Sequence, residues 1–159
     1  MPEAAFAGMA EAEDALAPET ENSGPAPART AALRHRTWLF LNERRHQMRA
    51  RWAEFFQRFD VLLMPATPVT AIRHDHSDRL TRTIAVNGAS RDYNDQLAWV
   101  GLITMAYLPA TVAPVGLSRA GLPVGVQIAG PYLEDRTTID FAERLAGVIG
   151  GFQAPPGYE

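Results

Sequence analysis

The stretch from Leu108 to Pro131 constrains the fold more than any other part of this 159-residue chain. It contains a single charged residue, and proline and glycine punctuate it at its ends and in its middle. The apolar runs Ala110–Val115 and Pro123–Ala129 predict two buried strands. The short loop 116–121 between them favours antiparallel pairing, because a close reversal joins neighbouring antiparallel strands.

The second of these strands should pack closely on one side. Successive strand residues point to opposite faces, so one face carries branched residues and the other carries small residues and one amide. An amide buried without hydrogen-bond partners is costly. Gln127 is therefore interpreted either as a structural residue that holds a neighbouring loop or as a contact for a substrate. The two faces are formed by Val124, Val126 and Ile128, and by Gly125, Gln127 and Ala129.

A long helix is predicted over residues 30–59. Large apolar residues recur there at steps of three and four, with Arg45 as the one polar interruption. We expect this stripe to pack on the chain's own core, and a groove for a cofactor or a partner is the alternative. The stripe consists of Trp38, Leu41, Met48, Trp52, Phe55 and Phe59.

The remaining elements are predicted from local signals. Asn87-Gly88 is a turn signal, and Asp135 is a candidate N-cap for the last helix. In that helix Ala142, Leu145 and Ile149 should face the core. The expected elements are a buried strand Asp60–Met64, a short strand Ile84–Val86, a helix Arg91–Tyr107 and a helix Asp135–Ile149.

Composition excludes several classes of protein. A hydrophobic content of 47% and a charged content of 21% describe a globular chain rather than a disordered one. The net charge of −3 is too small to suggest nucleic acid or an anionic membrane as a partner. The sequence has no cysteine, hence no disulfide and no thiol nucleophile. We expect a cytoplasmic protein without a signal peptide, with residues 1–29 as a flexible segment.

One segment resembles a membrane span by length alone. Leu97–Ser118 carries no charge and is long enough to cross a bilayer. Pro109 and Pro114 interrupt it, and the part before Pro109 has the length of a buried helix. We therefore expect no membrane span.

No self-contained catalytic or metal site is predicted. His74-Asp75-His76 offers metal-ligating side chains, but a zinc site needs three or four ligands, and the other histidines lie on the long helix. We interpret this segment as a solvated loop and expect no metal and no cofactor. None of the four serines lies in a Gly-x-Ser-x-Gly turn. All fifteen basic residues are arginine, so lysine-dependent chemistry is excluded for this chain.

Several motifs together resemble the C-terminal end of amidase signature enzymes. They are LPATVAPVG, GLPVGVQIAGP, EDRTTIDFAERL and the closing GGF with PPG. The earlier NERRHQMRARWAEFFQRFDVLLMPATPVTA is similar to the helix and strand that precede this region in the same family. The resemblance covers about residues 30–158. It implies an α/β fold with a mixed β-sheet flanked by helices, of which residues 30–159 form the C-terminal portion, incomplete on its own.

The resemblance also implies the chemistry. Family members hydrolyse C–N bonds of amides with a catalytic serine, a bridging serine and a lysine, a variation on the activation of a weak nucleophile by a neighbouring base. None of these residues maps onto this sequence, so no catalytic residue is assigned. What the resemblance implies here is scaffold and a wall of the substrate pocket over Trp99–Pro109. Trp99 and Tyr107 are the candidate substrate-binding residues, with core aromatics as the alternative.

Three hypotheses follow from the resemblance. The chain is a C-terminal fragment of an amidase for a non-peptide amide, inactive alone. Alternatively, it is a separately encoded partner that completes a split amidase, or a non-catalytic binding or scaffold module. A complementing chain or a homo-oligomer is an expected partner, and nucleic acid and membrane are not.

Overall fold

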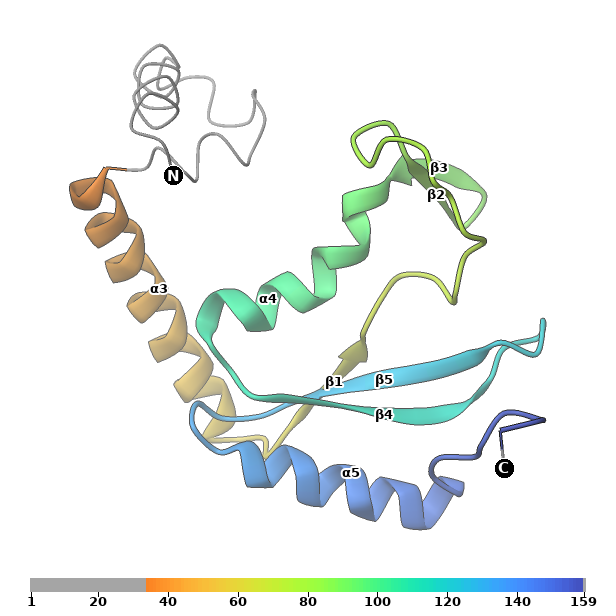
Figure 1. Cartoon of the computed structure of the whole chain (residues 1–159). Helices are drawn as coiled ribbons and strands as arrows, with labels where there is room; N and C mark the ends of the chain where they lie inside the picture. The colour runs from red at the N-terminus through yellow and green to blue at the C-terminus, as the bar shows by residue number, and fades with distance from the viewer. Residues whose placement is uncertain (1–33, 159) are drawn as a thin grey trace. The chain divides into compact units, whose positions relative to one another are not determined.

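The computed structural model describes residues 34–158 (Figure 1). The expected flexible segment 1–29 lies outside the described residues. The chain divides into two units, residues 1–46 and 47–159, and the sheets lie in the second. The helices are α3 (His35–Phe56), η2 (a 3₁₀-helix, Tyr93–Leu97), α4 (Ala98–Ala106) and α5 (Asp135–Ile149), and the strands are β1 (Leu62–Pro65), β2 (Thr83–Val86), β3 (Ala89–Asp92), β4 (Ala110–Leu117) and β5 (Pro123–Ala129).

A three-stranded antiparallel sheet in the order β1-β5-β4 organises the second unit. The predicted hairpin is confirmed: β5 has the expected bounds, and β4 continues to Leu117 through an irregularity between Pro114 and Gly116. The α/β architecture is confirmed as well. Figure 1 shows α4 and α5 on opposite sides of the β4–β5 hairpin.

The core lies on the face of the sheet that carries Met64 and Ala129. Ile103 and Ala106 of α4 and Leu108 complete this buried cluster. The C-terminal half of α3 packs against it through Met48 and Trp52 of the predicted stripe and through Phe56, which the stripe did not include. The N-terminal part of the predicted stripe is wrong, because Trp38 and Leu41 are 46% and 45% exposed. Phe59, the last residue of the predicted stripe, is instead 47% exposed, because α3 ends at Phe56.

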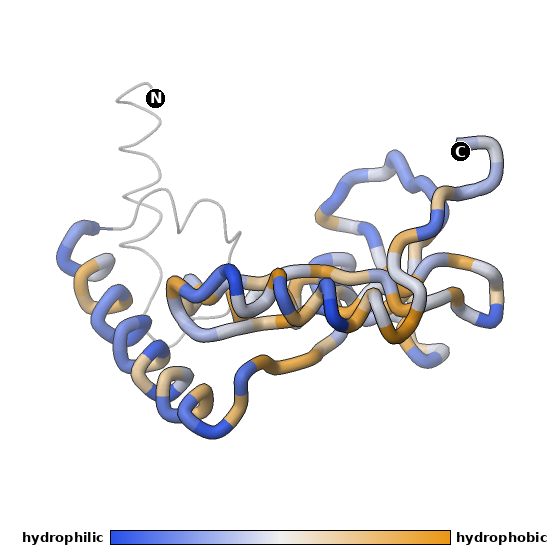
Figure 2. Tube along the Cα trace, turned by 90° about the horizontal axis from the view of Figure 1, so that it is seen from below, coloured by the Kyte–Doolittle hydropathy of each residue, from blue (hydrophilic) through white to orange (hydrophobic). Residues whose placement is uncertain are grey.

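The amphipathic helix α5 covers the opposite face. Figure 2 shows apolar and polar residues interleaved along it, as expected for a helix with one apolar side. Its one fully buried residue, Thr138, shares a hydrogen bond of 2.9 Å between hydroxyl oxygens with Thr111 of β4. Ala142 and Leu145 are part-buried as predicted, whereas Ile149 is 43% exposed. The predicted N-cap is wrong by one residue: Glu134 is the N-cap, without a side-chain capping bond.

The side chain of Gln127 forms a hydrogen bond to a residue of the neighbouring strand β1. Its side chain is buried, and its amide Nε2 donates to Met64 Sδ at 3.1 Å. Met64 is its direct partner in the register of β1 and β5. The structure therefore satisfies this amide across the sheet, where the sequence suggested a loop or a substrate.

The predicted helix Arg91–Tyr107 is wrong at its N-terminal end. Asn87 and Gly88 both have left-handed backbones, with φ of 52° and 81°, which two-residue hairpin turns require. This turn pairs Ala89–Asp92 with Thr83–Val86. Pairing with β2 thus places Arg91 and Asp92 in a strand, and α4 begins only at Ala98.

Strand edges and apolar side chains are left uncovered. Among residues 34–158, β1 and β4 each have a neighbouring strand on one side only. Leu63 on β1 and Val112 on β4 are 47% and 58% exposed. Within the same residues, no helix combines the length and the apolarity that crossing a bilayer requires.

We predict from these edges that the isolated chain is marginally stable, aggregates or needs a partner. Unpaired strand edges and exposed apolar faces template association with other chains. The measurement is size-exclusion chromatography combined with thermal unfolding of the purified chain. A sharp cooperative melt from a monomer that stays in solution would contradict this prediction.

Candidate functional site

Helix α4 is the element on which the candidate residues lie. Its sequence AWVGLITMA contains no charged residue, yet only Ile103 and Ala106 are buried. Beside this buried stripe Leu102 and Met105 are 43% and 54% exposed, and we call these two residues the α4 outer face. An uncharged helix with large apolar residues in solvent is typical of a surface that another element covers.

Trp99 lies on the core-facing side of α4. It precedes Ile103 and Ala106 by four and seven residues, so the three share one stripe of the helix. Trp99 nevertheless remains 38% exposed, because the core cluster contacts only the later turns of the stripe. This position is compatible both with a pocket wall and with a core aromatic.

Tyr107 ends the same helix. It is the C-cap residue in the left-handed conformation, with φ 56°, and its N–H bonds back to the carbonyls of Ile103 and Thr104. The side chain is 55% exposed. Trp99 and Tyr107 are eight residues apart, about 12 Å along a helix axis. The structure therefore places them at opposite ends of α4.

An open cavity of about 340 Å³ adjoins Tyr107. It is formed where the C-terminus of α4 meets the loop before α5, and Leu133 there also has a left-handed backbone, with φ 66°. Strained backbone of this kind is concentrated at functional sites. Sequence reasoning missed Leu133, which no motif marks, and considered Asp135 only as an N-cap. The lining residues are Thr104, Tyr107, Leu108, Pro109, Leu133 and Asp135, and Trp99 is not among them.

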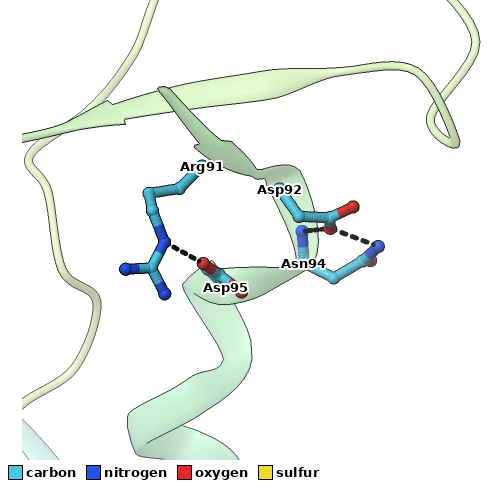
Figure 3. Close-up of polar contacts among 4 residues, drawn as sticks. All are labelled: Arg91, Asp92, Asn94 and Asp95. Carbon is cyan, nitrogen blue, oxygen red and sulfur yellow. Dashed lines mark hydrogen bonds and ion pairs between the residues drawn. The ribbon is translucent and has the colours of Figure 1, made fainter. Parts of the chain in front are cut away.

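Three hydrogen bonds to two aspartates fix the start of η2 and α4. Arg91 Nε donates to Asp95 Oδ2 at 2.7 Å, and Asp92 Oδ1 accepts from the Asn94 backbone N–H at 2.7 Å and from Asn94 Nδ2 at 2.9 Å (Figure 3). The aspartate thus caps the 3₁₀ turn from which α4 continues. These contacts orient the helix that carries Trp99.

The Ser118 hydroxyl and the two loop imidazoles have local structural contacts. Ser118 Oγ accepts the N–H of Leu122 in the β4–β5 turn at 3.1 Å. The rings of His74 and His76 lie edge-on, 6.3 Å apart. Across residues 34–158, His, Asp and Glu side chains form no group of three that could hold a metal ion.

Two pKa shifts reflect local hydrogen bonds on the surface. The backbone N–H of Ser77 lowers the pKa of the Asp75 carboxyl, with smaller contributions from the Ser77 side chain and Arg82. A hydrogen bond from Arg144 to Asp140 raises the pKa of that guanidinium. Both groups are exposed to water, so neither shift marks a catalytic acid or base.

Comparison with known proteins identifies the family by sequence. The family model described as Amidase matches residues 11–139. The chain is 29% identical over 116 residues to fatty-acid amide hydrolase 2-A of Danio rerio, covering 73% of this chain and 19% of that protein. It is 35% identical over 109 residues to a glutamyl-tRNA(Gln) amidotransferase subunit of Deinococcus deserti, covering 65% of this chain and 20% of that protein.

Solved structures agree on the fold. A crystal structure of an amidase superposes with a TM-score of 0.63 at 19% identity, covering 92% of this chain and 33% of that one. A chain from a structure described as an unexpected vestigial protein complex, related to an s-triazine catabolic enzyme, superposes with the same TM-score at 21% identity over 95% of this chain and 33% of that one. The present sequence spans about a fifth of the curated relatives and a third of these solved chains. This chain belongs to the amidase family.

Proposed function

We propose that this chain is the C-terminal part of an amidase that hydrolyses the C–N bond of a non-peptide amide. It supplies scaffold and part of the substrate-pocket wall, and it is inactive alone. Two facts support this: the sequence contains no lysine, and it spans 19% of an amide-hydrolase relative. The serine pair, the lysine and the oxyanion hole of the family's chemistry would come from the remaining part of the enzyme.

The observation that carries the proposal is the incomplete coverage of α4. Leu102 and Met105 are open to solvent on one side, and Trp99 is over a third exposed on the side that otherwise faces the core. A helix without charge is unstable in this environment unless a further surface covers it. The catalytic part of an amidase would bury the α4 outer face.

We further propose that Trp99 and Tyr107 contribute to the pocket wall at two separate points. Trp99 would contact the acyl side of the substrate, because an exposed indole provides a large apolar surface. Tyr107 would form its part of the pocket wall at the cavity that it lines with Leu133. The proposed enzyme is cytoplasmic, acts on a small-molecule amide and uses no cofactor.

The experiment that tests the proposal is co-expression with an amidase polypeptide that carries the Ser-Ser-Lys set but lacks this C-terminal region. Amide hydrolysis by the pair, and not by either chain alone, would support the proposal. Hydrolysis by the 159-residue chain alone would refute it, as would failure of the pair to associate. Ligand binding by the lone folded chain would instead favour a non-catalytic module.

A separately encoded partner is the second candidate. The uncovered edges of β1 and β4 and the α4 outer face provide surfaces for a second chain. One of the solved neighbours is described as part of a protein complex, and the amidotransferase relative is one component of a larger enzyme by its name. Co-purification of the natural chain with a larger, lysine-containing chain distinguishes this candidate from a fragment.

Replacing Trp99 by alanine is expected to change substrate preference in the assembled enzyme. Loss of a pocket-wall indole should alter the ratio of kcat/KM between long and short acyl groups by about tenfold, because apolar pocket contacts contribute roughly 1–3 kcal/mol each. The matched control is Trp38→Ala, which removes an exposed tryptophan from α3. An unchanged ratio with lowered stability would identify Trp99 as a core aromatic.

A further inference from the structure

A second cavity, which the proposed function does not use, lies on the loop between β1 and β2. Its volume is about 230 Å³, and it is formed by consecutive residues of this loop together with the start of η2. The side chains that surround it are rich in positive charge and hydrogen-bond donors. The lining residues are Ile72, Arg73, His74, Asp75, His76, Arg82 and Tyr93.

Arg82 holds this loop in place. Its Nε and its Nη2 both donate to the carbonyl oxygen of Ser77, at 2.8 and 2.5 Å, and close the segment 77–82. The outer N–H groups of the guanidinium are not used by these two bonds. The guanidinium lies over the ring of Tyr93, 5.6 Å from its centroid, and the Tyr93 N–H donates to the Arg82 carbonyl at 3.2 Å. The cavity therefore has a floor built by specific contacts, although most of the loop is exposed.

The one carboxylate among the residues that line this cavity, Asp75, already accepts a hydrogen bond. Asp75 Oδ1 accepts the backbone N–H of Ser77 at 2.8 Å, and this bond lowers the pKa of the carboxyl. Asp75 therefore stays ionised and has a hydrogen-bond partner of its own. Arg73, by contrast, forms no ion pair with a carboxylate of residues 34–158.

The other hydrogen-bond donors and charges that line this cavity are suited to a negatively charged ligand. The lining contains two guanidinium groups and one carboxylate, and two imidazoles and a phenol add further hydrogen-bonding groups. Guanidinium groups bind carboxylate and phosphate through paired N–H donors, which gives strong charge-assisted bonds. A cation would meet net positive charge here.

We propose that this cavity binds a small oxyanion, a carboxylate or a phosphate, through Arg73 and the face of Arg82 turned away from Ser77. The site uses neither Trp99 nor Tyr107 and goes beyond the amidase proposal. Arg73 supplies the second contact, because its side chain is exposed and forms no ion pair with an acid among residues 34–158. Arg82 supplies the fixed contact, because Ser77 and Tyr93 hold it.

The test is titration of the 159-residue chain, or of its complex with a catalytic part, with sodium phosphate and separately with sodium acetate. Binding is followed by NMR shifts of the imidazole and tyrosine ring protons at low and constant ionic strength. Saturable shifts confined to His74, His76 and Tyr93 are expected. Tighter binding of phosphate would identify a phosphate-bearing ligand, and tighter binding of acetate a carboxylate. No saturable shift with either anion would overturn the proposal.

Matched arginine variants separate a site from general charge attraction. Arg73→Gln is expected to weaken binding about tenfold or more, since a charge-assisted hydrogen bond contributes roughly 1.5–3 kcal/mol. Arg79→Gln removes the same charge from the same loop outside the cavity, where Arg79 Nη2 bonds to Asn94 Oδ1 at 2.9 Å. Equal weakening by both variants would overturn the proposal. Because binding is measured without turnover, its outcome is independent of amidase activity.

Discussion

Co-expressed with a catalytic amidase part that carries the Ser-Ser-Lys set, the 159-residue chain is expected to restore amide hydrolysis from background to enzymatic rates. Enzymes accelerate their reactions by about 10⁶-fold or more, so the difference between the pair and either chain alone should be of that order. The chain lacks lysine, and the proposal assigns no part of the nucleophile to it. In the proposal its contribution is structural, through the faces of the sheet and of α4 that the described residues leave uncovered. The measurement is turnover of a chromogenic amide by purified pair and purified single chains.

A charge on the α4 outer face should abolish the amide hydrolysis that the pair of chains restores. Leu102→Asp places a carboxylate where the proposal puts an apolar interface, and burying an unpaired charge costs several kcal/mol. We expect a loss of about 100-fold or more in activity of the pair, together with loss of co-purification. The control is Val148→Asp, the same type of change at a position of α5 that is 83% exposed. Full activity of the Leu102→Asp pair would show that the catalytic part does not cover α4.

The sequence predicted best where local and tertiary signals agree. The β4–β5 hairpin was predicted because its apolar runs, its glycine-containing turn and its strand partner lie close together in the chain. The helix Arg91–Tyr107 was wrong at its start, because pairing with β2 decides the structure of Ala89–Asp92. Strand propensity depends on such context more than helix propensity does.

The candidate site was harder to predict than the fold. Trp99 and Tyr107 follow from a resemblance, and periodicity alone would have placed Trp99 in the core stripe of α4. The cavity beside Tyr107 depends on Leu133, whose left-handed backbone no residue pattern indicates. Arg49 also lies over the neighbouring Tyr132 ring, 4.0 Å from its centroid, and joins α3 to this loop across most of the sequence. Predictions from local sequence patterns do not include contacts between residues so far apart in the chain.

A large effect on stability is expected at Gly130, which follows β5 directly. A Cβ at this position would lie 2.6 Å from Thr138 Cγ2, closer than two carbons can approach. Thr138 cannot rotate away without cost, because its hydroxyl bonds to Thr111 Oγ1 and donates to the Asp135 carbonyl, both at 2.9 Å. Thr138 is also 1% exposed, so the surrounding packing opposes its displacement.

Gly130→Ala is therefore expected to lower the free energy of unfolding by about 2–3 kcal/mol, the combined cost of overpacking and of a strained hydrogen bond. The measurement is urea unfolding followed by tryptophan fluorescence, on the chain or on its complex with the catalytic part. The control is Gly147→Ala on α5, where a Cβ meets no atom within 4 Å. That change should stabilise the helix by about 0.5–1 kcal/mol. If both alanine variants were equally stable, α5 would not pack on β4 as closely as the Thr111–Thr138 contact requires.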